Sequence, residues 1–228
     1  MLLSQKPYFL TPKGTAKMAD TAALENSGKI RTARQSPAAL LAPAFESGSS
    51  PGIVELRELR FQTMVGLRVD PRIDAGHRLA AVVGGLPAVC GEVRGAGDVA
   101  IVWQGPTEFL AIAPPEAHES LGGDLLPALR EALSGGEGQV VDLSANRTAF
   151  ELTGPRARDV LEKGCSLDLH PRVLKPGTAV STEIGNIPAI LWKTGDESFR
   201  ILPRASFAQF LGSWLLDAMR EYASPEVP

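Results

Sequence analysis

Two stretches, VWQGPTEFLAIAP (102–114) and LWKTGDESFRILP (191–203), repeat one spacing of residues within a chain of 228. In each, a tryptophan (Trp103 or Trp192) stands 11 residues before a proline and five before a glutamate. Apolar runs on both sides of a polar turn are typical of a β-hairpin. The chain therefore contains two related hairpins.

The similarity extends beyond the hairpins. LGGDLLPAL (121–129) is echoed by LGSWLLDAM (211–219), and VDPR (69–72) is loosely echoed by TGPR (153–156), so the offset is 84 to 90 residues. Each copy reads strand, helix, strand, strand, helix, and the first copy adds a closing strand. This order predicts an α+β fold of duplicated ferredoxin-like units, each an antiparallel sheet with its helices on one side.

The spacing of apolar residues places the individual elements. We expect strands at 64–69, 98–104, 108–113, 138–144, 147–153, 177–184, 187–193 and 198–203. We expect helices at 74–84, at 115–133 with Pro127 as a kink or a second start, and at 155–163 with Gly164 as a left-handed stop.

The final helix has the clearest pattern. Its apolar residues recur at helical spacing and predict one stripe that faces a core: Phe207, Phe210, Leu211, Trp214, Leu215, Ala218 and Met219. Such a stripe also suits a partner, but core packing is the more common role.

Three segments follow from this pattern. Residues 1–52, rich in Ala, Ser, Pro and Gly and without a regular apolar period, are expected to form an extended or disordered arm. Residues 53–144 and 145–228 are expected to form the two ferredoxin-like units. The arm carries six Lys or Arg against three Asp or Glu, a net charge of +3. The rest of the chain carries 17 against 23, a net charge of −6. Such an arm either lies on its own domain or an acidic partner, or is a free tail.

Composition excludes several classes of protein. A net charge of −3 disfavours a nucleic-acid-binding surface, and no apolar run approaches the roughly 20 residues that cross a bilayer. The N-terminus lacks the basic-then-apolar order of a secretory signal. Cys90 and Cys165 make no disulfide framework. We expect a cytoplasmic protein whose partners are neither nucleic acid nor membrane.

Three motifs lack the context that their chemistry requires. GSSPG (48–52) matches the nucleophile elbow, but it lies in a polar linker. GAGDVA (95–100) imitates a dinucleotide fingerprint, but it precedes a strand and not a helix. Asp168 and His170 offer two metal ligands without a third, so we expect no metal site.

The most polar run, DLSANR (142–147), joins two expected strands. Asp142 and Ser144 suit a turn, in which their side chains accept backbone N–H bonds. Asn146 and Arg147 are harder to explain by a turn, and a guanidinium fork is suited to a carboxylate or carbonyl across an interface. A local structural role is the alternative for this pair.

The run LDLHPR (167–172) reads as a loop whose His and Arg reach local carbonyls or a neighbouring chain. Together with the previous run it supplies the candidate residues of a partner interface: Asn146, Arg147, His170 and Arg172.

The order of strand, DLS, strand, TGPRA and helix resembles the folate-binding fold of the glycine-cleavage aminomethyltransferases, as does LKPGTA (174–179). The phrases DLSANRTAFELTGPRARDVLEKGCSLDLHPR (142–172), FRILPRASFAQFLGSWL (199–215) and WQGPTEF (103–109) resemble one branch more specifically, the gamma subunits of heterotetrameric sarcosine oxidases. The resemblance covers roughly residues 55–222.

The chain departs from its catalytic relatives in one turn. Active aminomethyltransferases have a Gly-Gly-x-x-Asp-Asp turn after the Pro-Gly strand, and its acidic group handles the folate-linked amine. Here EIGNIPAILWK (183–193) stands at that place, with no carboxylate between Glu183 and Asp196. A related iron–sulfur maintenance protein has a Lys-Gly-Cys run, but Lys163-Gly164-Cys165 ends a helix here and the residues after it do not match.

The resemblance implies a non-catalytic structural subunit of a flavin-dependent sarcosine oxidase, with alpha, beta and delta subunits as partners and alpha as the main contact. In that family the larger subunits hold FAD, FMN, NAD and tetrahydrofolate. They oxidise sarcosine to glycine and pass the one-carbon unit to tetrahydrofolate. This chain is then expected to bind no cofactor and to carry no catalytic residue.

Three alternatives stay open. The chain is the equivalent subunit of an N-methylglutamate dehydrogenase, or an autonomous folate-dependent aminomethyltransferase-like protein whose acid is Asp142 or Glu151, or a free-standing interaction module.

Overall fold

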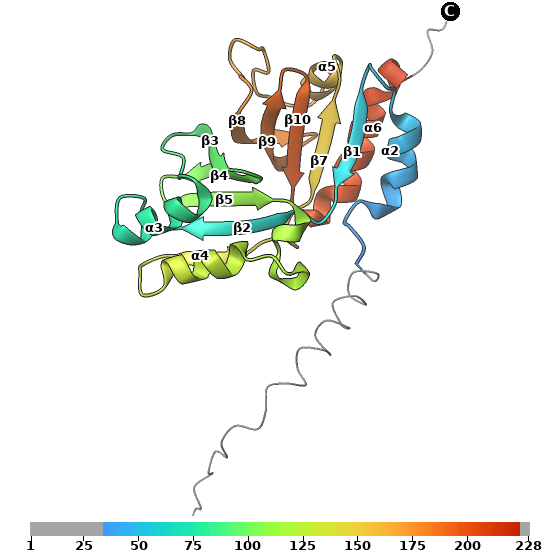
Figure 1. The fold of residues 1–228 in the computed structure, drawn as a ribbon. Coiled ribbons are helices and arrows are strands. Elements are labelled where there is room, and N and C mark those ends of the chain that lie inside the picture. The colour runs from blue at the N-terminus through green and yellow to red at the C-terminus, as the bar shows by residue number, and fades with distance from the viewer. Residues whose placement is uncertain (1–33, 224–228) are drawn as a thin grey trace, which may run out of the picture. The chain divides into compact units, whose positions relative to one another are not determined.

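The computed structural model describes residues 34–223, and the compact unit that begins at Gln35 contains all of the described helices and strands. Within it, ten strands form one curled antiparallel sheet in the order β1-β7-β10-β9-β8-β3-β4-β5-β2-β6 (Figure 1). The strands are β1 (Glu55–Leu59), β2 (Thr63–Arg68), β3 (Gly91–Ala96), β4 (Val99–Gly105), β5 (Glu108–Ala113), β6 (Gln139–Asp142), β7 (Ala149–Thr153), β8 (Thr178–Ile184), β9 (Ile187–Gly195) and β10 (Ser198–Pro203).

The α-helices are α2 (Ala42–Gly48), α3 (Asp74–Val83), α4 (Leu125–Leu133), α5 (Ala157–Glu162) and α6 (Ala208–Ala223). Four 3-10 turns accompany them: η1 (Ala39–Leu41), η2 (Pro115–Ala117), η3 (Glu119–Leu121) and η4 (Ala205–Phe207). The single helix expected over 115–133 is therefore two 3-10 turns followed by α4. Pro127 lies in the first turn of α4, where its missing N–H is tolerated.

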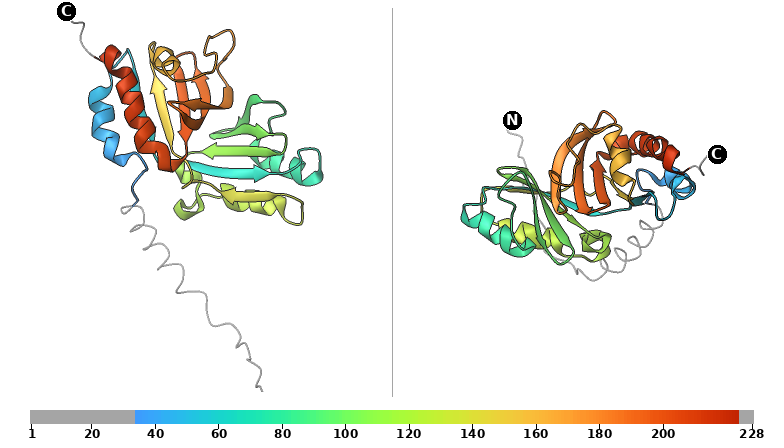
Figure 2. Two further views of the ribbon diagram at one scale, coloured as in Figure 1. Left: turned by 180° about the vertical axis from the view of Figure 1, so that it is seen from behind. Right: turned by 90° about the horizontal axis from the view of Figure 1, so that it is seen from above.

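The first unit consists of β2, α3, β4, β5, α4 and β6. Its sheet order β4-β5-β2-β6 is that of a ferredoxin-like fold. α3 and α4 lie side by side against one face of this sheet (Figures 1 and 2). Leu79 of α3 and Leu129 of α4 are fully buried against Val65 and Leu67, alternate residues of β2.

The second unit consists of β7, α5, β9, β10 and α6, and takes its fourth strand from the other end of the chain. β1 pairs with β7 from Glu55↔Thr153 to Leu59↔Ala149, which gives the order β1-β7-β10-β9. β3 and β8 are added strands at matched places, and Gly91↔Ala179 joins the two halves of the sheet. The α+β fold of duplicated units is confirmed. β1 follows the expected boundary at residue 53, and its partner strand β7 belongs to the second unit.

The two tryptophans of the repeat lie on opposite faces of the sheet. Trp103 packs against the helix-covered core of the first unit, and Trp192 packs against the cluster on the helix-free face. The tryptophans are 89 residues apart, whereas β5 and β10 begin 90 residues apart. Trp103 pairs with Phe109, whereas the matching Phe199 pairs with Lys193, so Trp192 stands one residue before the position that corresponds to Trp103. A one-residue shift turns a side chain to the other face.

Residues 39–48 correct the prediction of an extended arm over 1–52, of which residues 1–33 lie outside the described part. These residues are helical, and α2 lies beside α6 and β1 (Figure 1). Phe45 is buried and meets the ring of Phe150 edge-on, with centroids 5.8 Å apart. The helix is too short for an apolar period to stand out in the sequence.

A carboxylate of β1 holds the start of this segment. Glu58 accepts hydrogen bonds from the Ser36 hydroxyl, from the Ala38 N–H at 3.1 Å, and from the Thr148 hydroxyl at 2.7 Å. Glu58 thus connects the chain before η1 to the residue that precedes β7.

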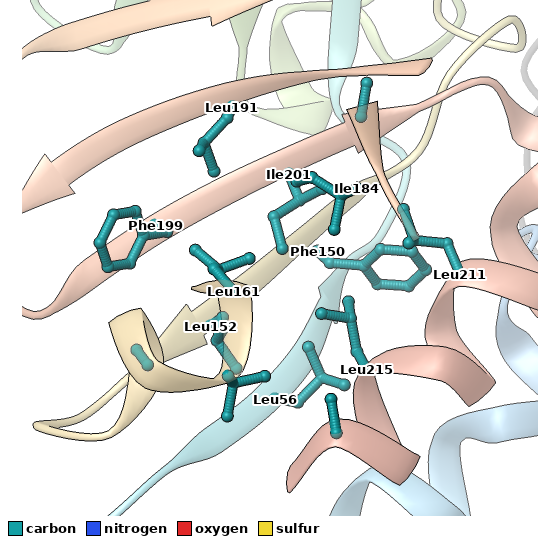
Figure 3. Packing of buried hydrophobic residues seen from close by; sticks show 14 of the residues in the cluster. Leu56, Phe150, Leu152, Leu161, Ile184, Leu191, Phe199, Ile201, Leu211 and Leu215 are labelled. Carbon is teal, nitrogen blue, oxygen red and sulfur yellow. The ribbon is translucent and has the colours of Figure 1, made fainter. Parts of the chain in front are cut away.

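Figure 3 shows the core of the second unit. Phe150 and Leu152 of β7 and Ile201 of β10 face Leu211 and Leu215 of α6, and all five are fully buried. Apolar side chains on one face of the sheet thus meet the inner side of the final helix.

The sheet buries only part of the apolar stripe that the sequence predicts along α6. Leu211, Leu215, Ala218 and Met219 are buried as predicted, whereas Phe207 and Phe210, in η4 and the first turn of α6, are 36% and 56% exposed. The prediction that Phe207 and Phe210 face the core is wrong, because the sheet and its neighbouring loops occupy only part of the circumference of the helix.

The helix-free faces of the two halves of the curled sheet also meet. Met64, Val102, Leu110 and Ile112 of the first unit are buried with Ala149, Ala179, Ile190 and Leu202 of the second. Among the described helices, none combines the length and apolar character that a membrane span requires.

Candidate functional site

The polar run that joins the two units forms a closed turn. Asp142 Oδ1 accepts the Ser144 N–H at 2.9 Å, and Ser144 Oγ accepts the Met64 N–H at 3.1 Å. His118 Nε2 lies 3.0 Å from Asp142 Oδ2, so the same carboxylate also holds the chain at η3. Asp142 and Ser144 therefore shape the turn, as the sequence predicts.

The pKa of Asp142 reflects these contacts. Partial burial raises the pKa, but the hydrogen bonds from Ser144 and then His118 outweigh burial and bring the pKa below its usual value. A carboxylate held ionised in this way is a poor proton donor. Asp142 does not have the properties expected of a catalytic acid.

Glu151, the other candidate acid, is also engaged. It lies on β7 between Arg57 of β1 and Arg200 of β10, its direct cross-strand neighbours. Arg57 Nε donates to Glu151 at 2.6 Å, and Arg200 Nε lies 3.6 Å from the other oxygen. The guanidinium of Arg200 in turn covers the ring of Trp192 at 5.1 Å. Glu151 is thus one member of a cross-strand row of ion pairs.

The turn that carries the amine-handling acid in aminomethyltransferases is too tight for that role here. Ile184 pairs with Ile187, so only Gly185 and Asn186 connect β8 to β9. Both have positive φ, 57° and 64°, as a type I′ hairpin turn requires. The indole of Trp214 covers Gly185 closely. These residues do not fit a site for the folate-linked amine, because the turn has no acid and no space beside Gly185.

Asn146 and Arg147 lie where the turn meets the start of the last helix. The Asn146 carbonyl accepts the Ala205 N–H at 2.9 Å, and Arg147 forms an isolated antiparallel bridge with Arg204. Arg147 Nη1 donates to the Leu202 carbonyl at 2.9 Å. Burial, and then the charge of Arg204, lower the pKa of Arg147. Asn146 is exposed and Arg147 is half-buried, so part of this pair is accessible from outside.

His170 and Arg172 lie elsewhere, in the loop between α5 and β8. His170 donates its backbone N–H to Asp168 Oδ1 at 2.9 Å, and His170 Nδ1 accepts the Arg172 N–H at 3.2 Å. Both side chains are exposed. The four candidate interface residues thus divide into two pairs on different loops.

The possible metal pair gains no third ligand in the structure. Asp168 already accepts the His170 N–H, and His170 accepts the Arg172 N–H. Within residues 34–223, no three His, Cys, Asp or Glu side chains come together in a way that could hold a metal ion.

Two features of the surface and core were missed by sequence reasoning. Lys193 is fully buried at the end of an apolar strand, and its Nζ donates to the Leu174 carbonyl at 3.1 Å beside a cavity of about 330 Å³. Phe207 and Phe210 are exposed. The sequence did contain a signal for the burial of Lys193. A lysine that directly follows an apolar run in a central strand is expected to be buried together with that run.

Comparison with known proteins gives a consistent result. A family model described as "Sarcosine oxidase, gamma subunit family" matches residues 66–221. A sarcosine oxidase subunit gamma from Arthrobacter sp. is 51% identical over 198 residues, which cover 85% of this chain and 94% of that protein. One from Corynebacterium sp. strain P-1 is 48% identical over 196 residues, with the same coverage.

Solved structures are similar as well. Heterotetrameric sarcosine oxidase from Corynebacterium sp. U-96, in complex with pyrrole 2-carboxylate, has a chain with a TM-score of 0.79 and 46% identity, covering 86% of this chain and 99% of that one. Aminomethyltransferase T of the Bartonella henselae glycine cleavage system has a TM-score of 0.57 at 14% identity. The match covers 79% of this chain and 49% of that one. The second likeness shows the fold alone. The chain belongs to the sarcosine oxidase gamma subunit family.

Proposed function

We propose that this chain is the gamma subunit of a heterotetrameric sarcosine oxidase and acts in it as a structural, non-catalytic subunit. The similarity to gamma subunits along 85% of the chain carries the proposal. In the assembly, the alpha, beta and delta subunits hold FAD, FMN, NAD and tetrahydrofolate and carry out the oxidation of sarcosine to glycine. The chain binds none of these groups and works in the cytoplasm.

The engagement of its acidic residues supports a non-catalytic role. Asp142 shapes a turn, Glu151 is paired with Arg57, and the tight turn at Gly185 has no acid. A general acid or base needs a free carboxylate within reach of substrate. Asp142 and Glu151 are engaged within the scaffold, which supports the proposal that they do not act on a substrate.

The chain would stabilise the assembly by burying surface against the alpha subunit. Asn146 and Arg147 on one loop, and His170 and Arg172 on another, are the proposed contacts. Arginine is enriched at protein interfaces, because its planar fork binds carboxylates and carbonyls with little further loss of freedom.

Co-expression of the tagged chain with its neighbouring genes tests the proposal. The expected product is a yellow complex with three other polypeptides that produces peroxide when sarcosine is added. A complex that oxidises N-methylglutamate instead would favour the dehydrogenase alternative. A colourless, well-folded single chain that binds tetrahydrofolate would contradict the structural role and favour an autonomous transferase.

A further inference from the structure

The start of the last helix presents two exposed aromatic rings. Phe207 and Phe210 stand three residues apart, which puts them on one side of the chain. Gly212, further along α6, lies against Leu41 and Phe45, so η1 and α2 cover a different flank of the helix. A contiguous exposed apolar patch is a common mark of an interaction site, and two phenylalanines on one side of the chain are candidates for such a patch.

Two arginines lie close to these phenylalanines along the backbone. Arg204 precedes Phe207 by one 3-10 turn, and the Phe207 N–H donates to the Arg204 carbonyl at 2.9 Å. Arg147 is the bridge partner of Arg204, and side chains of such a pair stand on the same face. Among residues 34–223, no carboxylate forms an ion pair with either arginine, although 13 ion pairs occur elsewhere in this part of the chain.

The local charge is opposite to that of the surrounding domain. Residues 53–228 carry 17 Lys or Arg against 23 Asp or Glu, a net charge of −6. Two adjacent arginines without carboxylate partners are unfavourable in isolation, because like charges repel and Arg147 is half-buried. A partner that supplied negative charge would remove this penalty.

We propose that Arg147, Arg204, Phe207 and Phe210 form one docking surface, the arginine–phenylalanine surface, and that its occupant is an acidic segment of another subunit. The inference rests on the proposed function as a subunit and specifies which face is used. One or two carboxylates of the segment bind the guanidinium groups, and a neighbouring apolar side chain covers the rings.

The chemistry of the surface suits this occupant. Arginine and aromatic residues are the side chains that most often dominate binding energy at the centre of an interface. Carboxylates bind a guanidinium through charge-assisted hydrogen bonds, which strengthen when apolar neighbours exclude water. The surface also contains Arg147, one of the residues that the sequence had singled out for partner contact.

Two substitutions in the co-expressed complex test the inference. Phe210→Ala removes an exposed ring, so the fold of the chain should be unaffected. Arg204→Glu reverses one charge. Matched controls are Leu40→Ala, at a 77% exposed position of η1, which contacts α2 and α6, and Arg220→Glu, an 81% exposed arginine side chain at the far end of α6. The measurement is the dissociation constant of this chain from the remaining subunits, at low and high salt.

We expect Phe210→Ala to weaken binding about 30-fold or more and Arg204→Glu at least about 10-fold, typical of central interface residues. The loss for Arg204→Glu should shrink at high salt, because salt screens the attraction. Both control variants should bind within about threefold of the unsubstituted chain.

The outcomes separate the inference from the function on which it rests. If the unsubstituted chain forms no complex, the proposed function fails. If it assembles and both test variants bind as the controls do, the function stands and the docking surface is wrong. If instead the two substitutions abolish self-association of this chain and leave the complex intact, the surface serves a second copy, and the inference is likewise overturned.

Discussion

The contact of Trp214 with two glycines allows a sharp test of the packing in the second unit. The indole lies across Gly164 and Gly185, whose backbones are joined by a hydrogen bond from the Gly185 N–H to the Gly164 carbonyl at 2.9 Å. A Cβ at Gly164 would lie 2.8 Å from Trp214 Cη2, and closer still to Cζ2. Carbon atoms pack best at about 3.5–4.0 Å, so the ring would have to move by about 1 Å.

Gly164→Ala should therefore destabilise the chain through overpacking. Such changes cost about 1–3 kcal/mol of the free energy of unfolding. For a domain of this size each kcal/mol lowers the melting temperature by about 2–4 °C, which gives a drop of about 2–12 °C. Thermal and urea unfolding followed by circular dichroism measure both quantities without relying on tryptophan fluorescence.

A double-mutant cycle with Trp214→Leu shows whether the collision is the cause. On the Trp214→Leu background the ring is gone, so Gly164→Ala should be almost neutral, with a coupling energy on the order of 1 kcal/mol or more. Gly105→Ala is the control, because its Cβ would meet Glu108 at an ordinary 3.6 Å. An equal loss on both backgrounds would refute the steric argument.

Two further changes test other contacts. Glu58→Ala removes the carboxylate that holds Ser36 and Thr148. This variant should lower the free energy of unfolding by about 2 kcal/mol or more in urea titrations, and Glu58→Gln should lower it less. Equal stability of all three forms would contradict the role of this carboxylate. The pKa of Asp142 lies below its ordinary 3.8 in the folded chain, so its stabilising effect is present above that pH and is lost as the pH falls through the lower folded value. Asp142→Asn should therefore flatten the dependence of unfolding free energy on pH below about pH 4, and unchanged steepness would count against the Ser144 contact.

The sequence predicted what depends on local pattern. The two hairpins were visible because alternating apolar residues and a turn lie within one short stretch, and the offset between copies then implied the duplicated fold. β1 was missed because Glu55, Arg57 and Glu58 give its segment little strand character, and its partner β7 lies far along the chain.

The candidate site was predicted only in part, for similar reasons. The turn at Asp142 and Ser144 follows from side-chain chemistry that acts within two residues, and it is confirmed. The exposure of Phe210 depends on how much of α6 the sheet covers, which no local pattern states. Gly164 was expected as a left-handed stop, but it is not among the glycines of positive φ; its lack of a side chain instead makes room for Trp214.

The borrowed strand β1 has a consequence for the order of events during synthesis. The first unit is complete once β6 has left the ribosome. β1 is synthesised before that unit, and its partner strand β7 comes after it. The end of β1 at Leu59 and the end of β7 at Thr153 are 94 residues apart. At about 5–20 residues per second, β1 has no partner strand for roughly 5 to 19 s. A circular permutant that carried residues 35–59 after α6 would make the two units one after the other and abolish that delay.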